Sequence, residues 1–312
     1  MENSKILVIG AGVNGSVCAA SLHNAGLDVT VLARGKRYDE LMRDGIVIED
    51  PFKHTRSSAK VPVILSLGPE DCYDFILVVI RKNQVRDLLP VLTQNQSENI
   101  VFMGNNLLGP EEMIEVLGKE RVLMGAVYAA GKRDGSIIRA MVANRVAAPF
   151  GEIDGRITPR LERLAAVLRR ARFKVELSSN IVDFQMTHAV GVALIGMLTL
   201  KHSCDTAALA RSRADLTLYI NAMREARMVM RKLGHNVIPW TEALIGDVPG
   251  FLQVVGLKML LSSRLGEVGL AWHVSQAPDE IQELARELKT LVDRAGIPAP
   301  AVLKVVESSG AI

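Results

Sequence analysis

Six residues near the amino terminus form a glycine-rich segment that could hold a pyrophosphate. The segment reads Gly10, Ala11, Gly12, Val13, Asn14 and Gly15. Gly10 allows a tight turn, Gly12 removes the side chain that would keep a pyrophosphate away, and Gly15 lets a helix pack on the preceding strand. Unpaired amides and the dipole at a helix N-terminus favour the negative charge of such a group. We therefore predict that all six residues contact a dinucleotide, the alternative being a strand-to-helix turn without a ligand.

The residues after the next apolar stretch indicate which dinucleotide this is. A protein that prefers NAD offers an Asp or Glu about 20 residues beyond the glycines, to hydrogen-bond the ribose 2′-hydroxyl. Residues 29–32 are instead followed by Arg34, Lys36 and Arg37, and no acidic residue lies among them. An arginine can bind a 2′-phosphate through two parallel charged hydrogen bonds. The sequence thus predicts NADP (as NADPH), held by Arg34 and Arg37, the alternative being a solvated basic loop.

Two further polar positions follow apolar runs, where the carboxyl ends of parallel strands bind ligands in open α/β sheets. Arg81 ends the run 75–80 and could hold a substrate carboxylate or a cofactor phosphate, with Lys82 in this role if the register shifts by one. Asn105 could hydrogen-bond the nicotinamide ribose or the substrate, with Asn106 as its alternative. A solvated strand end and turn formation are the corresponding structural interpretations. We predict Arg81 as a cofactor contact and Asn105 as both a cofactor contact and a catalytic residue.

A parallel sheet is needed to bring these positions together. Apolar runs alternate with amphipathic segments through the first half, which is typical of an α/β doubly wound (Rossmann-type) sheet with right-handed crossovers. Fully apolar runs suit parallel strands that are covered on both faces. We expect strands at residues 5–9, 29–32, 46–49, 61–65, 75–80, 99–103 and 122–128. We expect helices after Gly12, at 38–43, 85–92, from Pro110 and at 160–172, and a hairpin turn at Asp134 and Gly135.

The second half of the chain is predicted to be helical throughout. Residues 182–200 are apolar nearly all round, which marks a central helix that others bury. Further helices are expected at 216–233, 252–265 and 279–295. Gly191 and Gly196 within the central helix indicate a close approach to its backbone, by the cofactor or by a neighbouring helix. We therefore place a nucleotide-binding domain at residues 1–180 and an all-helical substrate and dimerisation domain at 181–312.

Composition excludes several classes of partner. Of the 312 residues, 49% are hydrophobic and 23% charged, and a net charge of +3 is too small to indicate nucleic acid. Only 4% are aromatic, so platforms for stacking bases are not evident. Neither the three cysteines nor the six histidines have the spacing of a metal site or a disulfide framework, so we expect no metal.

We expect a cytoplasmic protein without a membrane span. The first strand begins almost at Met1, which leaves no room for a signal peptide. Residues 184–200 carry His188, Gln185 and Thr187, and a stretch of about 17 residues is at the short limit for a span. A buried core helix is the better interpretation, and the apolar helical domain is a candidate surface for a homodimer.

Four segments of the chain resemble the ketopantoate reductase family (2-dehydropantoate 2-reductases and relatives). They are the glycine segment with Arg34, residues 74–85, residues 101–109, and residues 123–135, which contain Ala130. The resemblance implies a Rossmann domain, an all-helical second domain, and a cleft between them for nicotinamide and substrate, with Ala130 among the cofactor contacts. It also implies hydride transfer from NADPH to the carbonyl of a 2-oxo acid, which gives a 2-hydroxy acid.

The chain departs from the family pattern in the helical half. The family has a lysine as acid and asparagines one and two turns later, where this chain has Thr187, Gly191 and Ile195. Of the family's late Arg-x-Thr-Glu motif only the arginine and the glutamate are present, as Arg264 and Glu267, and the threonine is absent. The resemblance therefore implies a divergent member that lacks the usual catalytic lysine, and we expect a substrate other than ketopantoate.

His188 is the candidate to supply the proton in place of the lysine. Imidazole titrates near neutral pH, and proton transfer by a positioned side chain contributes about 10²–10⁴-fold. Gln185 lies on roughly the same helical face and could orient His188 or bind substrate. A histidine hydrogen-bonded in the core is the alternative. We predict an NADPH-dependent reductase of a small 2-oxo acid; the alternatives are a noncatalytic NADP(H)-binding sensor or partner-binding protein, and a true 2-dehydropantoate 2-reductase with a relocated acid.

Overall fold

The chain divides into two compact units. The computed structural model describes residues 4–126, 129–142, 146–238 and 248–310. The amino-terminal unit comprises Met1–Gly104 and Pro110–Val182, and the helical unit comprises Asn105–Gly109 and Asp183–Ile312. The segment Asn105–Gly109 thus follows a strand of the amino-terminal unit but belongs to the helical unit. The predicted single boundary near residue 180 did not anticipate this segment.

An eight-stranded sheet forms the centre of the amino-terminal unit and confirms the predicted doubly wound α/β fold. The strand order is β12-β11-β8-β7-β6-β1-β2-β5, and only the pair β8 and β11 is antiparallel. Every residue of β6 is buried, as expected of a parallel strand that is covered on both faces. The strands are β1 (Lys5–Ile9), β2 (Asp28–Leu32), β5 (Val63–Ile64), β6 (Phe75–Val78), β7 (Ile100–Phe102), β8 (Val122–Gly125), β11 (Ala148–Glu152) and β12 (Val175–Leu177).

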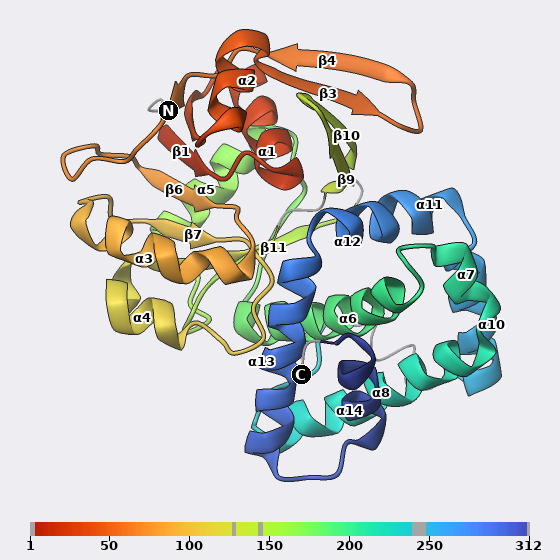
Figure 1. Ribbon diagram of the computed structural model, residues 1–312. Coiled ribbons are helices and arrows are strands. Elements are labelled where there is room, and N and C mark those ends of the chain that lie inside the picture. The colour runs from red at the N-terminus through yellow and green to blue at the C-terminus, as the bar shows by residue number, and fades with distance from the viewer. Residues whose placement is uncertain (1–3, 127–128, 143–145, 239–247, 311–312) are drawn as a thin grey trace. The chain divides into compact units, whose positions relative to one another are not determined.

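The connections between these strands run outward from β1 and β6 in opposite directions. The chain passes from β1 to β2 on one side and from β6 through β7 to β8 on the other. Right-handed crossovers then place α1 and α3 on opposite faces of the sheet, and α3 and α4 lie in front of β6 and β7 in Figure 1, with α5 behind them. The point between β1 and β6 is therefore the topological switch point, the place where open α/β sheets bind ligands. The helices are α1 (Val13–Asn24), α2 (Lys36–Asp44), α3 (Val85–Gln94), α4 (Glu111–Leu117) and α5 (Pro159–Arg170), with 3₁₀ turns at Lys82–Gln84 and Lys119–Arg121.

A second, four-stranded sheet in this unit was not predicted. Its order is β4-β3-β10-β9, with β3 (Ile46–Asp50), β4 (Thr55–Ala59), β9 (Ala129–Asp134) and β10 (Ile137–Val142). In Figure 1, β3 and β4 extend away from the large sheet. The strand expected at 46–49 therefore exists, but it pairs with β4 and β10 instead of joining the doubly wound sheet.

The hairpin turn predicted at Asp134 and Gly135 joins β9 to β10, with Gly135 at a φ of 59°. Positive φ is cheap for glycine, so the residue suits this turn. The strand predicted at 122–128 ends at Gly125, and residues 127–128 lie outside the described residues.

The core of the amino-terminal unit is formed by α1 and α5 against the large sheet. Cys18 and Leu22 of α1 pack with Leu161 and Leu164 of α5 and with Phe75 of β6. Complete burial raises the pKa of the Cys18 thiol to about 12, so this side chain behaves as a small hydrophobe. The core helices hold the first turn of α1 firmly against the end of β1.

The helical unit is built around α6, the apolar helix expected at its centre. By length and composition α6 could cross a membrane, but 67% of its most apolar window is buried inside the protein, as in the core helix of a soluble fold. The helix predicted at 252–265 ends at Leu261, because Ser263 caps a new short helix there. The helices are α6 (Ile181–Lys201), α7 (Thr206–Arg211), α8 (Arg213–Lys232), α10 (Gly250–Leu261), α11 (Arg264–Gly266), α12 (Trp272–Gln276), α13 (Pro278–Ala295) and α14 (Pro300–Ser308), with a π-helical turn at Glu267–Ala271.

The two glycines of α6 have different surroundings. A Cβ on Gly196 would lie 2.6 Å from Cδ1 of Ile281 in α13, so this glycine admits a neighbouring helix. A Cβ on Gly191 would meet nothing within 4 Å. Gly191 lies one turn beyond His188, so open space adjoins the backbone on the face of α6 that carries the histidine.

A buried carboxylate joins the end of α6 to the start of α8. Asp215 accepts hydrogen bonds from Lys201 Nζ at 2.7 Å, from His202 Nε2 at 2.8 Å and from Ser212 Oγ at 2.8 Å. Burial raises the pKa of Asp215, but these three hydrogen bonds outweigh it and lower the pKa to about 2. The carboxylate is therefore ionised wherever the protein is folded above strongly acidic pH.

Candidate cofactor-binding and catalytic sites

The glycine-rich turn has the geometry that a bound pyrophosphate requires. Gly10 has a φ of 108°, and a Cβ there would overlap the carbonyl oxygen of Val79. A Cβ on Gly15 would overlap the carbonyl oxygen of Gly10, so α1 can approach the end of β1 only with glycine at this position. Gly12 is exposed, and a Cβ there would meet nothing within 4 Å. Two of the glycines thus shape the turn, and the third leaves it open.

The N-terminus of α1 begins at this open glycine. Gly12 is the N-cap residue, no side chain caps the helix, and the first turn contains no acidic residue. The amides at this end are therefore available to an anion, and the helix dipole favours one. The pyrophosphate of a dinucleotide fits this site, with Gly10, Ala11, Gly12, Val13, Asn14 and Gly15 around it.

Arg37 holds this turn from within the protein. Its Nε donates to the Ala11 carbonyl at 3.1 Å, and its Nη2 donates to Ser16 Oγ at 3.2 Å. Its Nη1 donates to the Ser136 carbonyl at 3.1 Å and to Glu40 at 3.2 Å. Only 7% of Arg37 is exposed. The prediction that Arg37 contacts the cofactor therefore needs correction, because all three of its nitrogens bind protein groups and the side chain positions the turn.

Val13 and Asn14 connect the turn to the second sheet. Asn14 Oδ1 accepts a hydrogen bond from the amide of Ala129, the first residue of β9, at 3.0 Å. Val13 packs against a small cluster around Ile138 of β10. Ala130 follows Ala129 in β9 and is half-buried. The β9–β10 hairpin thus lies directly beside the first turn of α1.

Arg34 lies where a residue that binds the 2′-phosphate of NADP is expected. The carbonyl of Leu32, the last residue of β2, accepts a hydrogen bond from the Gly10 amide at 3.4 Å, so the end of β2 adjoins the turn. Arg34 comes two residues later with an exposed side chain and has no ion-pair partner among the residues that the structure describes. Lys36, by contrast, lies 3.9 Å from the carboxylate of Glu40.

Arg81 lies at the switch point of the sheet. It follows β6 and precedes the 3₁₀ turn Lys82–Gln84, with its side chain half-buried. Lys82 is buried. Because β6 neighbours β1, both cations follow a strand that lies beside the glycine turn. Arg81 is the more accessible of the two, since Lys82 is buried.

His188 lies on α6 in the helical unit with an accessible side chain. Its ring stacks on that of Phe184, with centroids 6.2 Å apart and an interplanar angle of 6°. The surrounding protein removes enough hydration to lower the pKa of His188 to about 4, and repulsion from His273 adds to this. His188 is therefore uncharged at neutral pH, and the residue is exposed.

The neighbours of His188 on α6 are turned inward. Gln185 is 4% exposed. Thr187 is buried, and its hydroxyl donates to the Asp183 carbonyl at 2.8 Å and accepts from the Ile238 amide at 3.3 Å. Thr187 thus stabilises the start of the helix, and it is His188 that faces outward.

Asn105 does not stand alone at the end of β7. Its Nδ2 donates to Oε1 of Glu280 in α13 at 3.0 Å, and Oε2 of the same carboxylate lies 3.9 Å from Nε2 of His273 in α12. Glu280 is buried. The helical unit thus brings Asn105, Glu280 and His273 together, and the charge of a protonated His273 would repel a charge on His188.

Sequence reasoning did not predict Glu280 or His273 as site residues. Glu280 follows Pro278 in the first turn of a helix, where an acidic residue is expected on electrostatic grounds alone. Glu267, the other acidic candidate, is half-exposed and pairs with Arg264 at 2.8 Å and with Trp272 Nε1 at 3.3 Å. No local sequence signal singles out Glu280, because its burial is known only from the structure.

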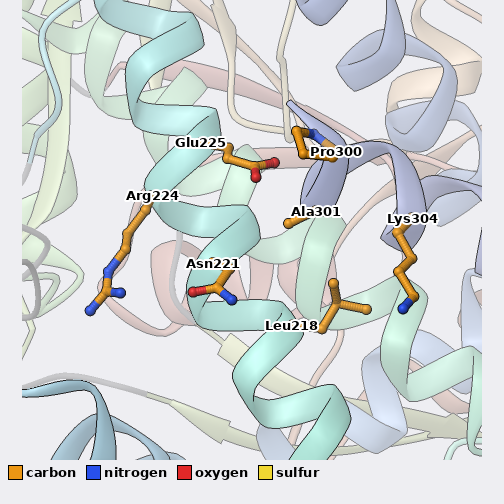
Figure 2. A pocket seen from close by; sticks show the side chains of 7 residues that line it. All are labelled: Leu218, Asn221, Arg224, Glu225, Pro300, Ala301 and Lys304. Carbon is orange, nitrogen blue, oxygen red and sulfur yellow. The ribbon is translucent and has the colours of Figure 1, made fainter. Parts of the chain in front are cut away.

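A hollow of about 500 Å³ lies between α8 and α14 (Figure 2). The Glu225 carboxylate in it accepts a hydrogen bond from the Val302 amide at 3.0 Å and so caps α14. None of the predicted site residues lines it, and we do not assign it to the reaction. It is lined by Leu218, Asn221, Arg224, Glu225, Pro300, Ala301 and Lys304.

Comparisons with known proteins find related sequences and a shared fold. Residues 6–154 match the family Ketopantoate reductase PanE/ApbA. The uncharacterized oxidoreductase YkpB of Bacillus subtilis is 28% identical over 63% of this chain and 65% of its own length, so the chain spans slightly less than two thirds of that relative. The 2-dehydropantoate 2-reductase of Archaeoglobus fulgidus is 26% identical over 75% of this chain and 76% of its own length.

Solved structures share the fold over nearly the whole chain. That of 2-dehydropantoate 2-reductase from Geobacter metallireducens has a TM-score of 0.78 and 19% identity, and covers 98% of this chain and 99% of its own. A ternary structure of D-mandelate dehydrogenase with NADH and anilino(oxo)acetate has a TM-score of 0.79 and 15% identity, and covers 98% of this chain and 97% of its own. Residues 6–154 are thus similar to the ketopantoate reductase PanE/ApbA family, and the chain adopts the fold of solved 2-dehydropantoate 2-reductases.

Proposed function

We propose that this protein is an NADPH-dependent reductase of a small 2-oxo acid. The open face of Gly12 over the uncapped N-terminus of α1 carries the proposal, because it is a site for a pyrophosphate in a chain related to dehydrogenases and reductases. The polar cluster of Asn105, Glu280 and His273 supports catalysis rather than binding alone, since a protein that only senses NADPH has no use for it. We propose a substrate other than ketopantoate, because Thr187 replaces the family lysine and is buried.

The reaction divides between cofactor and protein groups. NADPH, when bound, supplies the hydride that reduces the carbonyl carbon. The chain must polarise the carbonyl, provide a proton for its oxygen and hold the carboxylate of the substrate. We propose that the substrate lies over the open face of α6 at Gly191, where neutral His188 can donate a hydrogen bond to it. Arg81, as a fixed guanidinium fork, suits a carboxylate or a phosphate.

A panel of 2-oxo acids tests this function directly. NADPH oxidation is followed at saturating cofactor with pyruvate, 2-oxoisovalerate, phenylglyoxylate and ketopantoate. We expect turnover of at least one acid other than ketopantoate. NADPH binding without turnover of any acid would favour the noncatalytic sensor, and turnover of ketopantoate alone would show a 2-dehydropantoate 2-reductase with a relocated acid.

Arg34 is proposed to select NADPH over NADH. The fold alone leaves this open, since the D-mandelate dehydrogenase structures contain NADH. Arg34→Ala removes the contact with the 2′-phosphate, and at this exposed position we expect the contact to be worth about 2 kcal/mol, within the range of hydrogen bonds to charged groups. We expect the dissociation constant of NADPH to rise about 30-fold and that of NADH to change by less than about 3-fold, as measured by fluorescence titration.

Arg37→Met provides the matched comparison, because Arg37 holds the Ala11 carbonyl and has no exposed fork. It should weaken NADPH and NADH by similar factors. If Arg34→Ala also weakened both equally, Arg34 would not contact the 2′-phosphate.

A further inference from the structure

Helix α10 leaves much of its apolar surface uncovered. Among the residues that the structure describes, seven of the fourteen large hydrophobic side chains that are exposed lie between positions 248 and 265. Single exposed hydrophobic residues need no explanation, but such a concentration marks an interaction site. Within α10, Met259 is 70% exposed and Phe251 is 65% exposed. The exposed apolar side chains of α10 are Phe251, Leu252, Val255, Met259 and Leu260.

The other side of α10 is used for packing within the helical unit. The helix contacts α7 and α8, and it lies at the edge of the unit beside α7 (Figure 1). Leu261 is buried, and Gln253, Val254 and Leu257 are half-buried. At about 100° per residue these four positions lie on one side of the helix, and the exposed side chains lie on the other. A helix that is apolar all round is normally buried all round, so one side of α10 lacks its cover.

The exposed side of α10 has the form of a helix-packing surface. It consists of two neighbouring rows with a spacing of four residues, which are Phe251, Val255 and Met259, and Leu252, Gly256 and Leu260. Rows of this spacing are the ridges that interlock when two helices cross. Gly256 is exposed, and a Cβ there would meet nothing within 4 Å, so packing within one chain does not require glycine. Glycine destabilises the middle of a helix, but it permits the close approach of another backbone.

The lack of charge on this surface favours a partner that is itself apolar. Lys258 is the one charged residue in the sequence of α10, and the helical spacing places it at the edge of the exposed side. A charged partner would find little complementary charge there. A helix that lies in a membrane surface has a polar face opposite its apolar face, whereas the opposite face of α10 packs on α7 and α8. An identical surface on a second copy of the chain is equally apolar and fits best.

The area of the surface also fits a dimer. The exposed side chains of α10 present roughly 500 Å² of apolar surface, which is near the upper end for the largest patch on an ordinary monomer. A standard interface buries about 800 Å² on each partner and has an apolar core within a polar rim. The exposed side of α10 is large enough for such a core, and the exposed side chains of Lys258 and Ser262 beside it suit the rim.

We infer that α10 forms the centre of a homodimer interface, in which the α10 helices of two copies cross at Val255 and Gly256 about a two-fold axis. The same surface then meets itself, and the ridges of one copy enter the groove that Gly256 leaves in the other. The inference does not depend on the proposed function, because it uses none of the residues proposed to bind cofactor or substrate. It assigns the homodimer surface expected in the helical domain to one helix.

Val255→Asp is the test variant. It places two carboxylates close together in an apolar interface, where like charges repel. The variant should fold as a single chain, because Val255 is half-exposed there. At about 50 µM we expect light scattering after size exclusion to give the wild type the mass of two chains and Val255→Asp the mass of one. In sedimentation equilibrium the dissociation constant of the dimer should rise by about 100-fold or more.

Val116→Asp is the matched control. The same substitution is made at a valine of α4 that is 40% exposed, against 50% for Val255. It should leave the protein at the mass of two chains. Circular dichroism reports whether each variant is folded.

Gly256→Gln tests the same crossing without a charge. The single chain has room for the side chain, and glutamine favours a helix more than glycine does, so the fold is retained. The side chain holds the partner helix away, and we expect the dissociation constant of the dimer to rise by about 10-fold. This variant decides the question if Val255→Asp does not fold.

Four results would contradict the inference. The first is a wild type with the mass of one chain at the highest concentration tested. The second is dimerisation of folded Val255→Asp, or of Gly256→Gln, with the affinity of the wild type. The third is equal dissociation by Val255→Asp and Val116→Asp. The fourth is a monomeric wild type that sediments with phosphatidylcholine vesicles, which would assign the exposed side of α10 to a membrane surface.

Discussion

Gly12→Val is expected to leave the protein folded and to raise the dissociation constant of NADPH by about 100-fold. A side chain at Gly12 meets nothing within 4 Å, so the free protein has room for it. In the complex the same space is needed by the pyrophosphate, and loss of two charged hydrogen bonds of about 1.5 kcal/mol each corresponds to this factor. Titration of NADPH by fluorescence, together with the free energy of unfolding in urea, measures both parts.

Gly15→Ala is the contrasting variant, three residues along the same turn. Its Cβ would overlap the Gly10 carbonyl oxygen, which is backbone and cannot rotate away. We expect a loss of about 3 kcal/mol in the free energy of unfolding, as in an overpacked core. Wild-type NADPH affinity in a folded Gly12→Val protein would show that the pyrophosphate does not lie on this turn.

The second large effect is expected at Asp215, on the stability of the helical unit. Asp215→Asn keeps the shape of the side chain but replaces a charged acceptor of three hydrogen bonds by an amide. Lys201 donates as a cation, His202 donates from its imidazole ring, and the Asp215 side chain that accepts both bonds is buried. We expect the free energy of unfolding in urea to fall by about 3 kcal/mol.

The pH dependence provides an independent signature of this carboxylate. Because the pKa of Asp215 is lowered from 3.8 to about 2 in the folded protein, its contribution to stability is complete above 3.8 and is lost as the pH falls toward 2. The wild type should therefore lose more stability across this window than Asp215→Asn does.

Asp293→Asn is the control for Asp215→Asn, since Asp293 forms a pair with Lys289 at 2.7 Å but is 59% exposed. Surface pairs of this kind contribute about 0.5 kcal/mol or less. Equal effects of the two substitutions would mean that burial of Asp215 adds nothing to its hydrogen bonds.

Local sequence signals predicted most of the amino-terminal unit. Residues 6–9 and 75–80 are continuous apolar runs, and they contain strand residues that are buried, because such composition permits burial on both faces of a sheet. Pairing partners are a different matter. Ile46–Asp50 has the composition of any strand, and nothing in it states that β10, some 90 residues later, is its neighbour. The second sheet was therefore missed.

The candidate site was harder to predict than the fold for the same reason. The glycine spacing is a local pattern with a steric cause, and the structure gives each glycine the geometry that this cause requires. Arg34 and Arg37 look alike in sequence, yet one is exposed and the other binds the Ala11 carbonyl. Glu280 and Asn105 meet across 175 positions. No spacing rule connects residues so far apart.

The segment Asn105–Gly109 has a consequence for how the chain can be made and divided. The Leu107 amide donates to the buried carboxylate of Glu287 at 3.2 Å, and Asn105 donates to Glu280. A fragment that begins at residue 183 would leave both carboxylates without these donors, and a buried acceptor left unpaired costs about 1–3 kcal/mol.

During synthesis, residues 105–109 leave the ribosome long before their partners exist. These five residues cannot form their hydrogen bonds to α13 until α13 has been translated. The strands of the large sheet that precede and follow them in the chain can form earlier. The helical unit is therefore completed by a piece of chain made early. We expect it to fold last and only in the presence of the first, so that separate expression of the two halves yields one folded product at most.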